Sequence, residues 1–236
     1  MKPVMLLIPG MLNTAEIWSR VTPHIGDAAD VRIASVLTQS TIPDMAEDAW
    51  KMVADVKPGT PLVICGFSMG GYTAIEMLTH DSGRARQVTG LGLLDTSARP
   101  ESPEGRVTRE KTIAAIEKNF PKVVDGVLAF GTSPATHADE PLMQAMRKLM
   151  LDVGAEANIR QNRAIMARAD NRGKLAGLKV PTLVMCGRDD RITPPEVATE
   201  LAALVPGARL EWIDNAGHMT PMEQPARVAA LLKTLL

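Results

Sequence analysis

The chain has few cysteines, no long apolar run and almost no net charge, and each shortage excludes a class of protein. Its 236 residues include two cysteines, too few for a disulfide scaffold. No stretch approaches the roughly 18 consecutive apolar residues of a membrane-spanning helix. With 26 basic and 27 acidic residues the net charge is −1, so there is no basic field for nucleic acid or an anionic membrane surface. What remains, 45% apolar and 22% charged residues, is ordinary for a soluble globular protein.

Both cysteines, Cys65 and Cys186, lie inside apolar runs, which favours small buried side chains in a reducing compartment. The N-terminal apolar run of residues 4–8 lies between Pro3 and Pro9, and no small-residue cleavage site follows it. We interpret this run as a buried strand rather than a signal peptide. We therefore expect a cytoplasmic protein.

Short apolar runs alternate with amphipathic stretches along most of the chain. The expected strands cover residues 4–8, 31–35, 62–65, 88–94, 182–186 and 210–213, and the expected helices cover 45–56, 69–80, 195–204 and 224–236. Most of the runs lack polar alternation, as strands covered by helices on both faces do. The alternation predicts an α/β fold with a doubly wound, mostly parallel sheet.

Residues 98–171 interrupt this rhythm. Apolar positions recur there at spacings of three and four, as in Met143, Met146 and Met150, and prolines divide the stretch into several short helices. We therefore expect a core made of residues 1–97 and 172–236, with a helical insertion at 98–171. The length of 236 residues is compatible with one large domain that carries such an insertion.

The strongest local signal is the pattern G-x-S-x-G at residues 66–70, directly after the apolar run 62–65. A serine at a sharp strand-to-helix turn holds its hydroxyl clear of the backbone, and the glycines let neighbouring elements approach. The helix that begins at Met69 points its N–H groups at an oxyanion near Ser68. The pattern indicates a nucleophilic serine; the alternative is a glycine-rich turn with an N-capping serine.

A serine hydroxyl needs a base to take its proton, and the chain has four histidines. His24 and His80 fall in or at the end of expected helices, and His137 falls in a loop of the insertion, so we expect all three at the surface. His218 follows the last expected strand, at the edge where parallel sheets build their sites. We therefore predict that His218 is the base.

The imidazole needs an acid that fixes its tautomer and stabilises its charged form. The turn of residues 187–194 follows an expected strand and offers Asp189 and Asp190, and Asp95 ends another expected strand. Each of these residues could instead be an ordinary turn or cap residue. Sequence position alone does not separate the three.

Three motifs together resemble those of the α/β-hydrolase superfamily. They are G-F-S-M-G-G at residues 66–71 for the nucleophile elbow, G-R-D-D-R-I-T-P at 187–194 for an acid turn of the form G-x-x-D-x-x-x-P, and G-H-M-T-P-M-E-Q-P at 217–225 for the histidine loop. The resemblance implies an α/β-hydrolase fold with the triad Ser68, Asp190 and His218. Within the acid turn, the family's spacing selects Asp190 over Asp189.

The resemblance also implies an oxyanion hole and a cap. Its donors would be the N–H groups of Met69 and of Met11, in the loop after the first strand. Relatives usually carry His-Gly in that loop, whereas this chain has Pro9 and Gly10, so a supporting side chain is missing. Relatives also begin with an antiparallel hairpin, for which the nine residues before Gly10 leave no room, and we expect about six strands. Residues 98–171 take the place of the family's helical cap.

We expect a flexible, apolar substrate pocket. Met219 directly follows the predicted base, and Trp18, Met143 and Met146 are the further candidates for its lining.

Arg99, Arg106 and Arg109 are candidates for contact with a substrate carboxylate, with solvated helix faces as the competing explanation. The segment 94–100 is similar to one in small enol-lactone hydrolases. The chain is therefore interpreted as a serine hydrolase that cleaves a small ester or lactone through an acyl-enzyme. Hydrolysis of a carbon–carbon bond in a ring-cleavage product, thioester hydrolysis, and a silent member that binds a small ligand are the alternatives. No metal-ligand spacing, P-loop or dinucleotide fingerprint occurs, so we expect neither a metal nor a cofactor.

Overall fold

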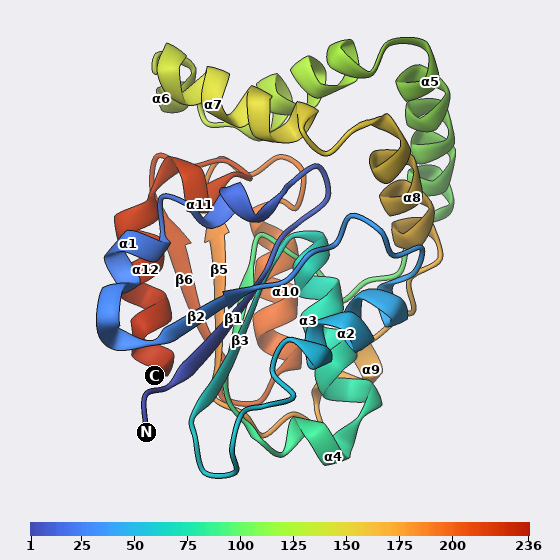
Figure 1. Cartoon of the computed structure of the whole chain (residues 1–236). Helices are drawn as coiled ribbons and strands as arrows, with labels where there is room; N and C mark the ends of the chain where they lie inside the picture. Colours follow the sequence, from blue (N-terminus) through green and yellow to red (C-terminus); the bar gives the residue numbers. More distant parts are fainter.

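A parallel sheet forms the centre of the protein (Figure 1). The computed structural model describes residues 1–236, apart from the side chain of Ser82. Within these residues the sheet has six strands in the order β2-β1-β3-β4-β5-β6, each parallel to its neighbours. The strands are β1 (Val4–Ile8), β2 (Asp30–Ile33), β3 (Leu62–Phe67), β4 (Val88–Leu94), β5 (Thr182–Gly187) and β6 (Arg209–Ile213). The predicted sheet of about six parallel strands is confirmed.

The strand order places the loops after β1 and β3 next to each other. The chain runs outward from β1 to β2 and then returns to pair β3 with the other side of β1. In open parallel sheets the crevice at such a reversal, outside the carboxyl ends of the strands, is the usual place for a site. The fold therefore brings the loop that follows Ile8 beside the turn that follows Phe67.

Helices cover both faces of the sheet (Figure 1). One face carries α2 (Ile42–Lys51), α3 (Met69–His80) and α10 (Pro195–Leu204), and the other carries α1 (Thr22–Ile25) and α12 (Pro225–Leu232). Shorter segments are α4 (Ser82–Ala85), α9 (Arg172–Leu175), α11 (Thr220–Glu223) and the 3-10 turns Ala15–Trp18, Gly26–Ala28 and Lys233–Leu235. Since both faces are covered, neighbouring strand residues such as Leu6 and Leu7 pack into opposite cores. This explains why the strands are unbroken apolar runs.

Some expected helix ends differ from those in the structure, because local capping sets them. α2 begins three residues earlier than expected, where the Thr41 side chain accepts a hydrogen bond from the Asp44 N–H (3.1 Å) and Pro43 lies in the first turn. The terminal helix expected over residues 224–236 is α12 followed by a 3-10 turn. The bounds of α3 and α10 agree with the prediction.

In the described part of the chain, four helices follow β4 and lie above the carboxyl ends of the strands (Figure 1). They are α5 (Pro103–Gly131), α6 (Pro134–His137), α7 (Glu140–Leu151) and α8 (Ala155–Met166). α5 is kinked at Asn119, whose backbone leaves the helical conformation two residues before Pro121. None of the described helices combines the length and the apolar character that crossing a membrane requires.

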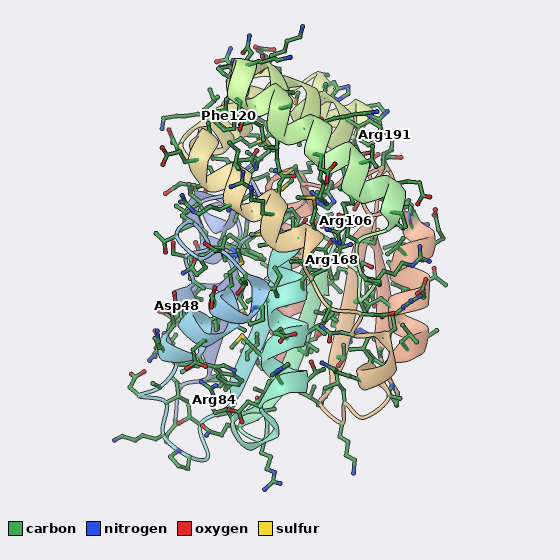
Figure 2. The ribbon with its side chains drawn as sticks, turned by 90° about the vertical axis from the view of Figure 1, so that its right-hand side faces the viewer. Asp48, Arg84, Arg106, Phe120, Arg168 and Arg191 are labelled. Atoms are coloured by element: carbon green, nitrogen blue, oxygen red, sulfur yellow. The ribbon has the colours of Figure 1, made fainter. Side chains whose placement is uncertain are left out.

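Polar contacts tie these helices to one another and to the core, and Figure 2 labels two of the arginines that make them, Arg106 and Arg191. Arg106 donates a hydrogen bond to the Met166 carbonyl (2.8 Å), which joins the start of α5 to the end of α8. Arg191, in the turn after β5, donates to the Phe130 carbonyl (3.0 Å) in the last turn of α5. A cationic side chain at that position satisfies a carbonyl that has no partner within the helix.

Candidate active site

Ser68 occupies the sharp turn between β3 and α3. Its backbone has φ +52° and ψ −117°, which residues other than glycine rarely adopt. The Ser68 N–H donates to the Leu94 carbonyl (2.8 Å), and the Ser68 carbonyl accepts from Thr96 Oγ1 (2.7 Å). A Cβ at Gly66 would collide with the backbone of Gly70, so glycine is needed for strand and helix to approach. These contacts hold the serine at the carboxyl edge of the sheet.

A continuous chain of hydrogen bonds joins Ser68 to His218 and Asp190. Ser68 Oγ lies 2.9 Å from Nε2 of His218, and Nδ1 of the same ring lies 2.8 Å from Asp190 Oδ2. Thr193 donates its hydroxyl to Asp190 Oδ2 (2.7 Å) and its N–H to Oδ1 (2.9 Å). Because the carboxylate holds a proton on Nδ1, Nε2 is the ring atom free to accept the serine proton.

The surroundings of this pair shift both pKa values. Burial disfavours the charged imidazole, but the charge and the hydrogen bond of Asp190, followed by the carboxyls of Asp95 and Glu223, together outweigh burial and raise the pKa of His218 above 6.5. Burial also opposes ionisation of Asp190, yet the charge of His218 and hydrogen bonds from His218 and Thr193 lower the pKa of this carboxyl. The arrangement therefore favours an ionised acid beside a ring that readily accepts a proton.

The two alternative acids do not pair with this ring. Asp189 is exposed. Asp95 is fully buried after β4, where it accepts hydrogen bonds from the Gly187 N–H (2.9 Å) and from the Thr220 hydroxyl. Burial, followed by the charge of the acid that pairs with His218, raises the pKa of Asp95 well above its usual range. In the described structure, Asp95 thus joins the ends of two strands to the histidine loop.

Asp95, Cys186 and Asp190 each bring one possible metal-ligand atom within 4.8 Å of the others. These atoms already make hydrogen bonds with the protein, including one from the Cys186 thiol to the Gly187 carbonyl (3.3 Å). Burial raises the pKa of the Cys186 thiol, which disfavours the thiolate that binds metals. The donor set fits a hydrogen-bonded cluster better than a metal centre.

The two predicted oxyanion donors lie at the ends of the neighbouring strands β1 and β3. Met69 is the first residue of α3, so its N–H has no acceptor within the helix. Met11 lies in the loop after β1 and lines a cavity together with Ser68. A Cβ at Gly10 would come within 2.9 Å of the Ser68 Cβ, so a glycine is needed for this loop to approach the serine.

A small cavity of about 50 Å³ lies beside Ser68 and His218. Its other lining residues are Met11, Asn13, Tyr72, Arg109, Val127, Gly131, Met150, Ile165, Ile192 and Met219. A wider cleft of about 510 Å³ shares four of these residues, Met11, Arg109, Val127 and Ile192. The site is therefore a narrow inner chamber beneath a wide outer cleft, with α5 and α8 contributing to the walls of both.

Met219 lines the inner cavity as expected, but Trp18, Met143 and Met146 line neither cavity, and this expectation is corrected. Trp18 and Met146 are fully buried in the core on the side of α12, and Met143 packs against that core. The methionine spacing did identify the buried face of α7. Met143 and Met146 on that face pack against the core, and Met150, one turn further along, reaches the wall of the inner cavity.

Of the three candidate arginines, Arg109 alone is among the described residues that line the inner cavity. Its guanidinium pairs with Glu101 and donates to Asn162 Oδ1 (3.1 Å). Arg99 pairs with a glutamate of α10, and Arg106 binds the backbone at the end of α8. Those two side chains serve contacts between elements.

The other histidines are exposed, as predicted. His80 Nδ1 lies 2.8 Å from Glu76, and His137 Nε2 lies 2.9 Å from the Thr132 hydroxyl. His24 is exposed at the end of α1.

Sequence reasoning did not single out Glu223, whose buried carboxylate organises the histidine loop. Its Oε1 accepts from the N–H groups of Gly217 (2.9 Å) and Met219 (3.0 Å), on either side of the histidine. Its Oε2 accepts from the Ser133 N–H (2.9 Å) and the Thr136 hydroxyl (2.7 Å), which belong to the inserted helices. The signal was available, since this glutamate is the E of the G-H-x-x-x-x-E-x-P pattern.

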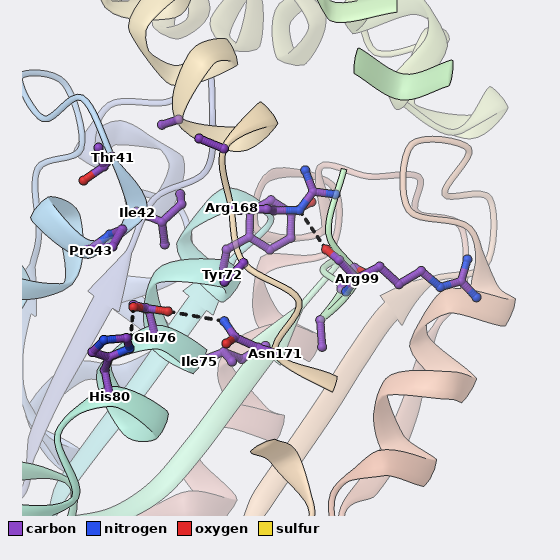
Figure 3. A pocket seen from close by; sticks show the side chains of 15 residues that line it. Thr41, Ile42, Pro43, Tyr72, Ile75, Glu76, His80, Arg99, Arg168 and Asn171 are labelled. Atoms are coloured by element: carbon purple, nitrogen blue, oxygen red, sulfur yellow. Dashed lines mark hydrogen bonds and ion pairs between the residues drawn. The ribbon is translucent and has the colours of Figure 1, made fainter. Parts of the chain in front are cut away.

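A separate cavity, of about 280 Å³, lies apart from the inner cavity and the outer cleft, between α2, α3 and the segment after α8 (Figure 3). It shares Tyr72 with the smaller cavity, and the Arg168 guanidinium lies 4.6 Å from the centre of the Tyr72 ring. Glu76 in its wall pairs with His80 and accepts from Asn171 Nδ2 (3.3 Å). The hydrogen-bonded serine and histidine line the smaller cavity, which is therefore the candidate active site.

Comparisons with known proteins place the chain in a family. The model of the alpha/beta hydrolase family matches residues 5–231. The chain is 29% identical over 182 residues to a pimeloyl-(acyl-carrier protein) methyl ester esterase of Stenotrophomonas maltophilia, which covers 73% of this chain and 68% of the relative. It is 26% identical over 198 residues to 3-oxoadipate enol-lactonase 1 of Acinetobacter baylyi, covering 82% and 70%.

A solved structure resembles the fold over nearly the whole chain. A thermophilic esterase from Thermogutta terrifontis superposes with a TM-score of 0.87 at 26% identity, covering 98% of this chain and 88% of that one. The family match spans both the sheet and the inserted helices. The chain belongs to the alpha/beta hydrolase family.

Proposed function

We propose that the protein is a serine hydrolase that cleaves a small carboxylic ester or lactone through an acyl-enzyme. The observation that carries this proposal is the unbroken hydrogen-bond chain from Ser68 Oγ through the His218 ring to Asp190 at the wall of a cavity. A nucleophile, a base and an acid in this order are the requirements of acyl transfer. The names of the relatives, an esterase and a lactonase, agree with it.

The reaction begins when Ser68 Oγ attacks the substrate carbonyl carbon and its proton passes to His218 Nε2. The carbonyl oxygen becomes an oxyanion, which accepts hydrogen bonds from the N–H groups of Met69 and Met11. As this intermediate collapses, the ring returns the proton to the leaving alcohol and an acyl-enzyme remains. Water, deprotonated by the same Nε2, then releases the acid and restores Ser68.

The shape of the site supports a small acyl group. The cavity beside Ser68 holds only about 50 Å³, whereas the cleft outside it holds about 510 Å³. We therefore assign the inner chamber to a short acyl chain and the outer cleft to the alcohol portion. A lactone, whose two portions are joined, would occupy both.

We also propose that residues 98–171 act as a cap. The helices of this stretch lie over the carboxyl ends of the strands (Figure 1), and Val127 and Ile165 from α5 and α8 line the inner cavity. Such a cover excludes water from the reacting carbonyl except where the outer cleft opens.

The test combines a covalent probe with a substrate panel. A fluorophosphonate should label the wild-type protein, and Ser68→Ala should lose both the label and at least about 10³-fold of kcat. Among p-nitrophenyl esters of two to twelve carbons, the shortest should give the highest kcat/KM. Ser97→Ala, at a buried serine outside the inner cavity, is the matched control and should keep both properties.

Three experimental outcomes would each contradict a different part of this proposal. Labelling that persists in Ser68→Ala would overturn the nucleophile assignment. An unlabelled, well-folded wild type would instead support a silent ligand-binding protein. A preference for acyl chains of ten or twelve carbons would contradict the assignment of the inner chamber.

A further inference from the structure

The peptide bond between Met11 and Leu12 is hydrogen-bonded at both of its ends. Its carbonyl oxygen, on Met11, accepts from Asn13 Nδ2 at 2.7 Å. Its N–H, on Leu12, donates to Gln161 Oε1 at 3.0 Å. Two side-chain amides therefore fix the orientation of a single peptide plane, immediately after the Met11 N–H that the proposed oxyanion hole uses.

Gln161 reaches this peptide from α8, far away in the sequence. Its side chain is fully buried, and its Nε2 donates to the Val36 carbonyl (3.0 Å) in the loop after β2. The two contacts determine the orientation of the amide, because only the oxygen can accept from an N–H and only the nitrogen can donate to a carbonyl. Arg160, the preceding residue, donates to the Leu37 carbonyl (2.8 Å). Hydrogen bonds thus join the middle of α8 to two loops of the core, those after β1 and β2.

The peptide is held in a conformation that its own residues disfavour. Leu12 has φ +59°, in the left-handed region that costs a residue with a branched side chain on the order of 1 kcal/mol or more. Rotation of the Met11–Leu12 peptide plane would relieve this φ and also change ψ of Met11. Without the Gln161 contact, the buried Leu12 N–H would lose its acceptor and the strained conformation would lose its main support.

We propose that Gln161 is a positioning residue for the oxyanion hole: from the inserted helix α8 it holds the backbone directly after Met11 in place, so that the Met11 N–H of the preceding peptide stays aimed at the reacting carbonyl oxygen. This inference rests on the proposed ester hydrolysis. It makes the insertion part of the machinery that stabilises the transition state, in addition to a cover over the site. Since an oxyanion exists only after attack by Ser68, the effect of Gln161 should fall on kcat rather than on KM.

The main variant is Gln161→Met, which keeps the volume of the side chain and removes both hydrogen bonds. Removing one oxyanion donor outright costs about 10²–10³-fold in kcat, so a misaligned donor should cost roughly 10- to 100-fold. KM for p-nitrophenyl acetate should stay within about twofold. The inhibition constant of a trifluoromethyl ketone, which forms the tetrahedral adduct on the serine, should rise by the same factor as kcat falls.

Asn158→Leu provides the matched control. Asn158 lies on the same face of α8, is equally buried, and its side-chain amide has no partner in the described structure. This variant should keep kcat and inhibitor affinity near those of the wild type. Hydrogen exchange of a peptide covering residues 9–14 should speed up in Gln161→Met and remain slow in Asn158→Leu.

Gln161→Glu keeps the test informative if Gln161→Met folds poorly. A buried neutral glutamic acid has the same acceptor and donor as glutamine. The ratio of its kcat to that of the wild type at the same pH should therefore be highest at low pH and fall as the carboxyl ionises against the Val36 carbonyl. Wild-type kcat and inhibitor affinity in a folded Gln161→Met would overturn the inference. So would equal losses in Asn158→Leu. Ser68→Ala separates failure of this inference from failure of the proposed function. If Ser68→Ala stays active, the proposed function itself fails.

Discussion

Two loops meet at Ser68, the proposed nucleophile, and they are held by different chemistry. The histidine loop depends on carboxylates: Asp190 binds the ring of His218, and Glu223 accepts the N–H groups on either side of it. The loop after β1 depends on neutral amides, those of Gln161 and Asn13. The side of the site that we propose moves protons is therefore charged and should respond to pH, while the side that we propose binds the oxyanion is neutral and should not.

The largest expected effect comes from removing the base on the charged side. His218→Ala should lower kcat by on the order of 10³–10⁶, because Ser68 then has no acceptor for its proton. The double variant with Ser68→Ala should be no worse than either single variant, since both act in one step. Steady-state kinetics on p-nitrophenyl acetate measures both. The exposed His137 supplies a control, His137→Ala, which should retain wild-type kcat; activity above a tenth of wild type in His218→Ala would contradict the assignment.

Replacing the acid should separate the two sides most clearly. The pKa of His218 is raised above 6.5, and the base must be neutral, so the acidic limb of kcat/KM should lie above pH 6.5 in the wild type. In Asp190→Asn the largest contribution that raises the pKa of His218 is gone, while burial still lowers this pKa. The limb should therefore move to lower pH while kcat falls about 10²–10⁴-fold.

Two variants serve as controls for this pH shift, because neither should move the acidic limb. Gln161→Met, on the neutral side, should lower kcat without moving the limb. Asp189→Asn should cost less than about tenfold and also leave the limb in place, because the Asp189 side chain is exposed. An unmoved limb in Asp190→Asn would argue against its pairing with the base.

Glu223→Gln should have a smaller effect that combines stability and rate. Whichever way the glutamine amide is turned, its NH2 group would face at least one backbone N–H, because the partners of the carboxylate are the N–H groups of Gly217 and Met219 on one oxygen and the Ser133 N–H with the Thr136 hydroxyl on the other. An unsatisfied buried contact of this kind costs about 1–3 kcal/mol, which for a chain of this size lowers Tm by a few degrees. We expect kcat to fall about tenfold because the histidine loop loosens. Thermal unfolding and kinetics at one pH check both; an unchanged Tm would contradict the role of Glu223.

Asp95→Asn should have the smallest effect on rate and a measurable effect on stability. The folded state raises the pKa of Asp95, so the neutral acid favours folding, and that contribution is lost as the pH rises from about 3.9 through the raised pKa. Asparagine never ionises. The variant should therefore unfold at a higher Tm than the wild type at pH 8, with the difference shrinking toward pH 4. A variant with crippled kcat would instead identify Asp95 as the acid.

The fold could be predicted from the sequence because its signals are local. The strand over Val88–Leu94 and the helix over Met69–His80 were predicted with the bounds that the structure has, since apolar runs and glycine turns mark them directly. The motifs around Ser68, Asp190 and His218 contain the turn geometry themselves. The structure brings those three side chains into one hydrogen-bonded chain.

Other parts of the site carry no local signal. Gln161 lies 149 positions from Leu12 in the sequence, and nothing near it indicates which loop it contacts. Periodicity showed that Met146 faces inward on its helix, but it could not show whether a core or a cavity receives it. Trp18, which was expected in the pocket lining, is likewise fully buried in the core. Pocket linings depend on how helices dock, and docking is determined by the whole fold.

The attachment of the inserted helices has a consequence for recombination. The stretch between β4 and β5 resembles an exchangeable module when it is drawn as a ribbon (Figure 1), yet Ser133 and Thr136 are bonded to Glu223, and Gln161 is bonded to Leu12. A chimera that receives this stretch from a relative would break those hydrogen bonds unless the core residue of each pair were transferred together with its partner in the insertion. The boundaries for successful exchange are therefore defined by pairs of residues across the interface rather than by the two points where the chain enters and leaves the insertion.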